Sequence, residues 1–301
     1  MLDLKGVIPP VISPLTQDRA VDVKSLKRLV DFVIHRGADG IFPLGSMSEG
    51  PLLTDSEANR VAETIVDHAN GRVPILLGTP ATSLARALPK AKQAQAIGAD
   101  AVVLVQPYYF PNQPQDGLYR YFTTVADAID IPLIIYNLPS TTQNPLTLDT
   151  MAKLAEHPNI IATKDSSGNL RYMMELIRIR DRVEGFRVFM GEEWAIAPAI
   201  LAGADGTVAG IASLGIKLVK AIYNAAKAEQ VAESMRLQNI LIDLFHGVYG
   251  PDARYWLAGH KEALAYLQII DSPAMLIDQP IDDGERKQIH ATVDRLREHL
   301  I

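Results

Sequence analysis

Cysteine is absent from this sequence of 301 residues. Its absence excludes disulfide bonds and thiolate metal sites, so a nucleophile would have to be lysine, serine, threonine, tyrosine or a carboxylate. The sequence also lacks an apolar run of about 18 residues, the length that spans a membrane. The first residues, MLDLKGVIPP, contain no basic region followed by a long apolar stretch. We therefore expect no membrane segment, no signal peptide and a cytoplasmic protein.

A strong charge of one sign is also missing. The formal net charge is −6, and the basic residues form no stripe of the kind that binds nucleic acid. Hydrophobic residues make up 48% of the chain and charged residues 21%, which is typical of a globular protein with a full core. We expect a small-molecule partner rather than a nucleic acid or a membrane.

Short apolar runs alternate with stretches of helical period through most of the chain. The runs lie at 7–12, 40–45, 73–78, 100–105, 131–137, 159–165, 186–191 and 206–210. Among the intervening stretches, 22–37 places apolar residues on one face, and 54–71 opens on Thr54 and Glu57 in a capping-box pattern. Eight such units in this length predict an α/β fold, a (β/α)8 TIM barrel. A doubly wound sheet fits less well, because no G-x-G-x-x-G motif follows the first run.

Beyond about residue 228 the strand pattern stops. Three stretches of helical pattern follow, at 228–248, 253–270 and 282–300. We therefore expect a barrel catalytic domain over 1–227 and a C-terminal three-helix appendage over 228–301.

A lysine ends one of the apolar runs, in the stretch NIIATKDSSGN. Chemistry in such barrels takes place at the C-terminal ends of the strands, where Lys164 and Tyr136 are expected on neighbouring strands. Burial disfavours a charged amine, and a neutral amine attacks a ketone to form a Schiff base. A phenol can exchange a proton with the substrate, and Ser46 could relay it. The backbone N–H groups of the turn around Ser46 could hold a carboxylate.

Each of these residues also has a purely structural interpretation. Lys164 could form an ordinary ion pair, for example with Asp165, and Tyr136 could be a core tyrosine with a satisfied hydroxyl. Glu193 could lie at a solvated helix N-terminus. The seven histidines show no metal-ligand spacing. The functional interpretation depends on these residue types occurring together at the expected strand ends.

Several motifs occur together in a familiar order: GVIPPVISPLT, GSMSE, PYY, YNLPS and KDSSGN. With them the chain resembles the dihydrodipicolinate synthase / N-acetylneuraminate lyase family of class I pyruvate-type lyases, from about residue 5 to its C-terminus. The resemblance implies that Lys164 is the Schiff-base lysine and Tyr136 the acid/base. It places Ser46 in a proton relay that Tyr109 completes, usually from a neighbouring subunit. It also implies a pyruvate-type keto acid as substrate and a homotetramer built as a dimer of dimers.

The resemblance implies further that Gly191 and Val208 line the site through backbone contacts, and that no metal or organic cofactor is needed. The sequence departs from the family pattern at Met47, where a second hydroxyl residue usually helps to hold the pyruvate carboxylate. It departs again at Ser48, which is usually glycine. The backbone N–H of Met47 or the hydroxyl of Ser48 would then have to take over carboxylate binding.

Another departure concerns the second substrate. Dihydrodipicolinate synthases usually carry an arginine after the YNxPS motif, where this chain has Thr141. Losing a guanidinium that binds a carboxylate through two hydrogen bonds is not a conservative change. Glu193 and Trp194 are expected near the wall of the site that binds substrate hydroxyls.

Four hypotheses remain at this point. The first is a Schiff-base aldolase that cleaves a 2-keto-3-deoxy sugar acid, or a similar 4-hydroxy-2-oxo acid, to pyruvate and an aldehyde. The second is dihydrodipicolinate synthase, which condenses pyruvate with aspartate semialdehyde; Thr141 argues against it. The third is a dehydratase acting on the same imine, and the fourth is a non-catalytic binding protein on this scaffold. Retention of Lys164 and Tyr136 argues against the fourth.

Overall fold

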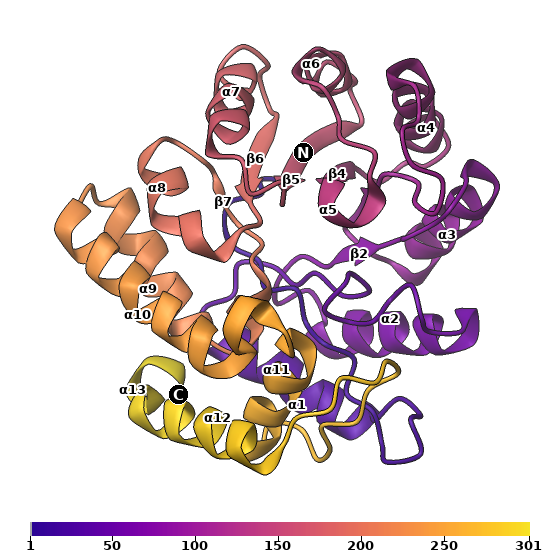
Figure 1. Cartoon of the computed structure of the whole chain (residues 1–301). Helices are drawn as coiled ribbons and strands as arrows, with labels where there is room; N and C mark the ends of the chain where they lie inside the picture. Colours follow the sequence, from indigo (N-terminus) through magenta and orange to yellow (C-terminus); the bar gives the residue numbers. More distant parts are fainter. Residues whose placement is uncertain (1) are drawn as a thin grey trace.

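A parallel sheet forms the centre of the computed structural model, which describes residues 2–301. Its strand order is β1-β7-β6-β5-β4-β3-β2, and every neighbouring pair is parallel. The strands are β1 (Gly6–Val7), β2 (Leu76–Gly78), β3 (Ala101–Val105), β4 (Leu133–Asn137), β5 (Ile160–Asp165), β6 (Arg187–Met190) and β7 (Gly206–Thr207). Helices surround the strands on the outside (Figure 1).

The sheet closes on itself through the second apolar run, 40–45. This run forms no regular strand, but Phe42 bridges Pro10 beyond β1, and Ile41 bridges Ile75 just before β2. Backbone hydrogen bonds accompany both bridges, including Phe42 N to Pro9 O at 3.0 Å. The predicted TIM barrel is confirmed, with the correction that its second run is irregular. Proline explains the irregularity, because Pro9, Pro10 and Pro43 have no N–H to donate to a continuous ladder.

The barrel helices alternate with the strands as predicted. They are α1 (Val23–His35), α2 (Asp55–Ala69), α3 (Leu84–Ile97), α4 (Gln115–Asp127), α5 (Pro139–Thr142), α6 (Leu148–Ala155), α7 (Leu170–Arg180), α8 (Ile196–Leu201) and α9 (Ile216–Lys227). Short 3-10 helices η1 (Glu193–Ala195) and η2 (Gly210–Ser213) follow β6 and β7. The Thr54 side chain accepts a hydrogen bond from Glu57 N, but within residues 2–301 the return bond from Thr54 N to Glu57 is absent, so the predicted capping box is only half formed. Apolar side chains such as Ile8, Val103 and Phe189 fill the barrel interior.

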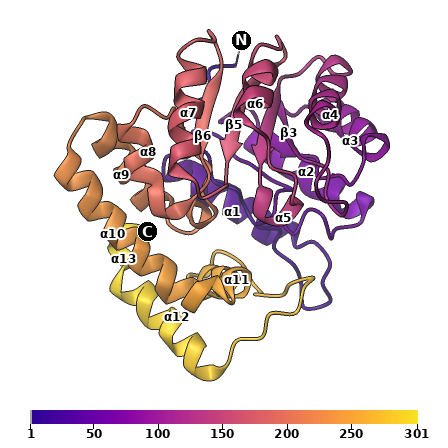
Figure 2. The same ribbon diagram turned by 45° about the horizontal axis from the view of Figure 1, so that its top comes forward.

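The C-terminal region is helical, as predicted. It contains α10 (Val231–Tyr249), η3 (Pro251–Ala253), α11 (Trp256–Tyr266), α12 (Asp283–Arg295) and α13 (Arg297–Leu300). The third predicted stretch is therefore two helices that meet at Leu296. Figure 2 shows α11 at the same end of the barrel as α5, which directly follows the C-terminal end of β4. The division into domains at residues 227 and 228 stays a proposal.

A buried histidine joins this C-terminal region to the barrel. His260 of α11 lies 2.9 Å through Nε2 from Ser213 Oγ and 2.9 Å through Nδ1 from Tyr249 OH. The three residues are at most 3% exposed, so a substrate cannot reach the Ser213 hydroxyl. We therefore interpret the contact as structural rather than catalytic. Burial, aided by the charge of Lys261, lowers the pKa of His260 to about 3.

The buried imidazole predicts a loss of stability in acid. Below about pH 6.5 the His260 side chain of the unfolded chain binds a proton, whereas the folded chain resists protonation down to about pH 3. The unfolded state then binds more protons, so the free energy of unfolding falls by about 1.4 kcal/mol for each pH unit in this window. Urea unfolding at pH 7 and pH 5 should show wild type losing roughly 2 kcal/mol more than His260→Gln.

Comparison with the His260→Gln variant is needed because other titratable groups change the free energy of unfolding in the opposite direction. Burial raises the pKa values of Asp165 and Glu193, so the effect of these two carboxyls is to increase the free energy of unfolding as the pH falls. Both carboxyls are present in wild type and in His260→Gln, so their effects cancel when the two proteins are compared. Parallel pH profiles for the two proteins would contradict the assignment to His260.

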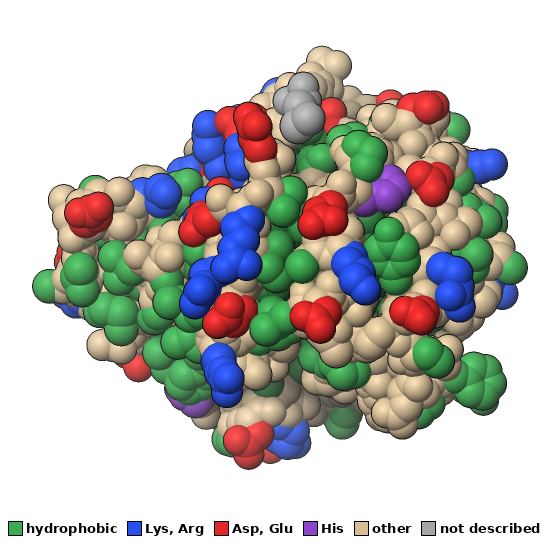
Figure 3. All heavy atoms as spheres, turned by 90° about the horizontal axis from the view of Figure 1, so that it is seen from above, with side chains coloured by type: hydrophobic (Ala, Val, Ile, Leu, Met, Phe, Trp, Pro, Cys, Tyr) green, Lys and Arg blue, Asp and Glu red, His purple; other side chains and the backbone are tan. Residues whose placement is uncertain are grey.

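On the face drawn in Figure 3, acidic and basic side chains are interspersed with apolar ones. Within residues 2–301, no helix has both the length and the apolar character needed to cross a bilayer.

Candidate active site

Lys164 and Tyr136 lie side by side at the C-terminal ends of β5 and β4, where the two residues are paired in register. Lys164 Nζ lies 4.0 Å from the centroid of the Tyr136 ring and 5.1 Å from the centroid of the Phe42 ring. Lys164 is only 5% exposed and Tyr136 only 7%. The amine therefore lies in an aromatic environment largely shielded from bulk water.

The alternative of an ion pair between Lys164 and Asp165 does not occur in the structure. Consecutive residues of a strand point to opposite faces, and Asp165 accepts hydrogen bonds from Asn137 Nδ2 at 2.6 Å and Ser167 Oγ at 2.7 Å. Within residues 2–301, no carboxylate oxygen lies within 4.0 Å of Lys164 Nζ. Lys164 therefore forms no ion pair within that distance.

A buried polar layer fixes the ends of these strands. Asn137 donates to Asp165, and Gln106 at the end of β3 donates through Nε2 to Asn137 Oδ1. Gln106 Oε1 in turn accepts from Leu138 N at 3.1 Å. Because Asn137 and Asp165 directly follow Tyr136 and Lys164, these bonds hold the strands that carry the phenol and the amine.

A cavity of about 210 Å³ opens above the amine. It brings together six residues predicted from the sequence: Ser46, Met47, Tyr136, Lys164, Gly191 and Glu193. It is also lined by Pro10, Phe42, Leu138, Ser140, Ser166, Glu192 and Gly210. The strand-end residues selected from the sequence therefore converge on one hollow of small-molecule size.

The turn that follows Phe42 contributes Ser46 and Met47 to this cavity, but not Ser48. Ser48 is 1% exposed, and its hydroxyl accepts from Leu44 N at 2.9 Å and donates to Val11 O. This hydroxyl is already engaged within the turn. The amide N–H groups of Met47 and Ser48 donate to no acceptor within residues 2–301, so they are free to bind an anion.

Gly191 and Val208 both lie close to Lys164. A Cβ atom at Gly191 would lie 2.1 Å from Ser166 Oγ and 3.0 Å from Lys164 Cε, so only glycine fits there. Val208 is 4% exposed and lies deeper, at a small apolar hollow that also borders Lys164. Its N–H donates to Met190 O at 2.8 Å, so that donor is already in use.

Glu193 places a carboxyl group in the cavity. Its Oε1 accepts a hydrogen bond from Ile211 N at 3.2 Å. Burial, reinforced by the charge of Glu192, raises the pKa of Glu193. A carboxyl group that holds its proton can donate a hydrogen bond to a substrate hydroxyl. Among residues 2–301, no three His, Asp or Glu side chains gather as a metal site.

A more apolar pocket of about 120 Å³ adjoins the cavity. The two share Phe42, Ser46, Tyr136 and Leu138, and the second pocket also contains Thr141. The structure thus places Thr141, an uncharged residue, in the lining of the same pocket as Tyr136.

Tyr109 is not part of either hollow. It is 81% exposed, has a φ of +90°, and packs edge-to-face on Phe110 with the ring centroids 5.0 Å apart. Within a single chain, Tyr109 therefore does not join Tyr136 and Ser46.

Sequence reasoning missed several lining residues. Ser140 and Ser166 stand inside the motifs YNLPS and KDSSGN, so the motifs themselves signalled them. Gly210 ends the last predicted strand. Phe42 lies in an apolar run, and nothing in its local sequence distinguishes it from an ordinary core residue.

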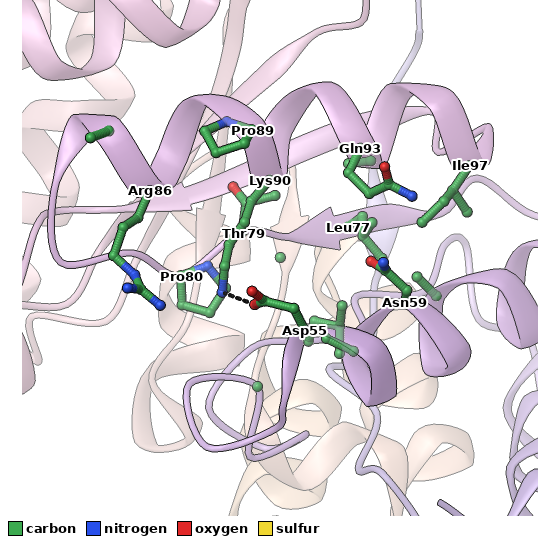
Figure 4. Close-up of a pocket in the computed structure, with 17 residues that line it drawn as sticks. Asp55, Asn59, Leu77, Thr79, Pro80, Arg86, Pro89, Lys90, Gln93 and Ile97 are labelled. Atoms are coloured by element: carbon green, nitrogen blue, oxygen red, sulfur yellow. Dashed lines mark ion pairs between the residues drawn. The ribbon is translucent and has the colours of Figure 1, made fainter.

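A larger hollow lies elsewhere. A groove of about 380 Å³ runs between α2 and α3, with Asp55 and Lys90 forming an ion pair at 3.6 Å across it (Figure 4). Arg86 and Gln93 of α3 and Asn59 of α2 also line it. It contains neither Lys164 nor Tyr136. The candidate site is therefore identified by its chemistry and not by the size of the hollow.

Comparison with known proteins agrees with this geometry. The sequence pattern of the dihydrodipicolinate synthetase family matches residues 3–296. A curated 4-hydroxy-tetrahydrodipicolinate synthase from Gluconacetobacter diazotrophicus is 36% identical over 238 residues, which cover 79% of each chain.

Solved structures show the same fold. A chloride-inhibited dihydrodipicolinate synthase from Acinetobacter baumannii, complexed with pyruvate, has a TM-score of 0.89 and 31% identity, covering 97% of this chain and 98% of its own. YagE, a prophage protein of the same family from E. coli in complex with pyruvate, has a TM-score of 0.91 and 28% identity over the same shares.

Proposed function

We propose, from the premise that this chain belongs to the dihydrodipicolinate synthetase family, that Lys164 forms a Schiff base with a pyruvate-type keto acid. Members of this family are Schiff-base lyases, so the chain is an enzyme of the class I aldolase type. One observation carries the assignment of the nucleophile. Lys164 is a buried amine without an ion-pair partner, packed against Tyr136 at the floor of a cavity.

The proposed reaction starts with a neutral Lys164. Its nitrogen attacks C2 of the keto acid, and loss of water gives a protonated imine. In the cleavage direction the C4 hydroxyl loses its proton through Tyr136, the C3–C4 bond breaks, and its electrons form the enamine. An aldehyde leaves. A proton then adds to C3, and water hydrolyses the imine to release pyruvate and the free amine.

The keto acid carboxylate is proposed to bind at the turn of Ser46 and Met47. The free N–H groups of Met47 and Ser48 support this placement, because neighbouring backbone amides form anion sites. The methionine side chain offers no hydrogen bond, and the Ser48 hydroxyl is already engaged with Leu44 and Val11. The N–H groups of Met47 and Ser48 are therefore the donors that we assign to this role.

For the rest of the substrate we propose a hydroxylated chain, as in a 2-keto-3-deoxy sugar acid or a similar 4-hydroxy-2-oxo acid. Glu193 can hydrogen-bond a hydroxyl, and Thr141 supplies no positive charge for a second carboxylate. A second candidate is the synthase reaction of pyruvate with aspartate semialdehyde. It is favoured by the name of the curated relative from Gluconacetobacter diazotrophicus.

A substrate panel tests this proposal. Pyruvate release and loss of water should be measured with several 2-keto-3-deoxy acids, and condensation should be measured with pyruvate plus aspartate semialdehyde. We expect pyruvate release from a keto-deoxy acid to have the highest kcat/KM. Loss of water without pyruvate release would identify a dehydratase instead. Efficient condensation with no cleavage of keto-deoxy acids would establish the synthase and overturn our choice.

The Thr141→Arg variant tests whether this position sets substrate choice. A guanidinium in the pocket should raise kcat/KM for condensation with aspartate semialdehyde by about 10- to 100-fold, the value of a charged hydrogen-bonded pair. Gln143→Arg adds the same charge at an exposed position outside both hollows and should change little. Equal kinetics for Thr141→Arg and wild type would show that discrimination lies elsewhere.

We propose that Tyr109 acts on a neighbouring copy of the chain. Its 81% exposure and its place beside the exposed Phe110 support this role. A homotetramer built as a dimer of dimers would then supply Tyr109 to each cavity from another subunit. The cytoplasmic location stays a prediction.

A further inference from the structure

We propose that helix α11 positions the catalytic turn through a buried ion pair between Glu49 and Lys261, although α11 contributes no atom to the cavity. The proposal rests on the function proposed for Lys164. It assigns a positioning role to the C-terminal helical region, because none of the residues that line the cavity comes from 228–301.

Glu49 ends the turn that carries Ser46 and Met47. Its side chain is 2% exposed and the Lys261 side chain 0%, and Glu49 Oε1 lies 2.6 Å from Lys261 Nζ. Glu49 Oε2 accepts hydrogen bonds from the backbone N–H groups of Leu276 and Ile277, at 2.5 and 3.3 Å. One carboxylate therefore ties the catalytic turn both to α11 and to the segment that follows it.

Lys261 uses all three of its ammonium donors. Besides Glu49 it donates to Ser13 O at 3.0 Å and to Ala274 O at 2.8 Å. Ser13 belongs to the segment that follows β1, and this segment also accepts a hydrogen bond from Ser48 at Val11 O. The ammonium ion thus joins three chain segments at the catalytic end of the barrel.

Stability alone does not account for such a pair. Two buried charges lose their hydration, and a well-packed apolar pair in the same space is often as stable or more stable. Directed hydrogen bonds, by contrast, fix orientation. Glu49 has a φ of +54°, a left-handed conformation that is uncommon for a residue other than glycine. The ion pair therefore holds a turn whose backbone N–H groups have to face the substrate carboxylate.

The neighbouring residue of α11 contacts a second loop that lines the cavity. His260 contacts Ser213 of η2, and η2 begins at Gly210, which lines the cavity. Within the same segment, Ile211 N donates to Glu193. Consecutive residues of one helix thus hold two loops that line the cavity, and these loops touch, because Met47 Sδ lies 3.1 Å from the position of a Cβ atom at Gly210.

The test uses the full chain with the double substitution Glu49→Gln and Lys261→Met, which removes both buried charges together. We measure the rate of borohydride-trapped adduct formation with pyruvate, kcat and KM with the best keto acid, and the urea unfolding curve. Misplacement of a binding group by about 1 Å can lower rates about 10²-fold. We expect cooperative unfolding to be retained, a rise in KM for the keto acid, and a 10- to 100-fold slower adduct with pyruvate.

Lys220→Met is the matched control. Lys220 pairs with Asp39 at 2.6 Å, and Asp39 accepts from Val7 N of β1. This pair also links a helix to the barrel, but it lies away from the cavity. The control variant should lose stability while the adduct rate and KM stay within about twofold of wild type, since residues away from the site affect stability rather than turnover.

If the double variant does not fold, Glu49→Asp replaces it, because it keeps the charge and shortens the reach by one methylene. Wild-type adduct rate and KM in a folded variant of either kind would overturn the proposal. Failure of the wild-type protein to form any adduct would instead refute the function proposed for Lys164. The two failures are therefore distinguishable.

Discussion

Substituting Lys164 with alanine is expected to lower turnover by about 10⁴-fold or more and to abolish the borohydride-trapped adduct with pyruvate. Removal of a covalent nucleophile eliminates every later step that depends on the imine. Lys164 is the lysine that the structure places in the cavity beside Tyr136. The measurements are pyruvate release from the best keto acid and the intact mass of the protein after reduction.

The matched control for this variant is Lys153→Ala. Lys153 is an exposed lysine of α6, so its substitution removes the same group without touching the cavity. It should retain wild-type kinetics and one trapped adduct. Measurable turnover by Lys164→Ala, with an adduct on another lysine, would contradict the assignment of the nucleophile.

Replacing Tyr136 with phenylalanine is expected to separate imine formation from the later proton transfers. The ring would still pack against Lys164, because the phenyl group fills the same space at 4.0 Å from the amine. The missing hydroxyl can no longer exchange a proton with the substrate, and general acid–base catalysis contributes about 10²- to 10⁴-fold. We expect kcat to fall by that factor while the adduct with pyruvate still forms.

The quantity to measure is the ratio of the rate of borohydride-trapped adduct formation to kcat. The matched control is Tyr121→Phe. Tyr121 is a buried tyrosine of α4, and its hydroxyl has no hydrogen-bond partner within residues 2–301, so its loss should leave kinetics unchanged. Wild-type turnover in Tyr136→Phe would remove Tyr136 from the acid–base role. Complete loss of trapping would instead assign the hydroxyl a part in imine formation.

The alternation of apolar runs and helical stretches is enough to predict the barrel. Hydrophobic periodicity is a local property, so the sequence alone places 159–165 and 131–137 as neighbouring strands. The run at 40–45 has the pattern of a strand but forms only bridges, because proline breaks the ladder on both sides of the contact. The split between α12 and α13 at Leu296 has no clear sequence signal, since helix boundaries depend on a few backbone angles.

The candidate site could be predicted where a residue type was unusual for its position. A lysine at the end of an apolar strand is such a signal, and Lys164 does lie against Tyr136 as that reasoning required. Contacts between residues far apart in the sequence could not be predicted, because no local pattern indicates them. Glu49 and Lys261 are separated by 212 positions, and only the folded chain reveals that they form an ion pair.

One measurement tests the central claim most directly: reduction of the wild-type protein with borohydride in the presence of pyruvate, followed by peptide mass spectrometry. The account predicts a single reduced pyruvate adduct, located on Lys164. An adduct on another lysine, or none at all on folded protein with pyruvate and with longer keto acids, would contradict it.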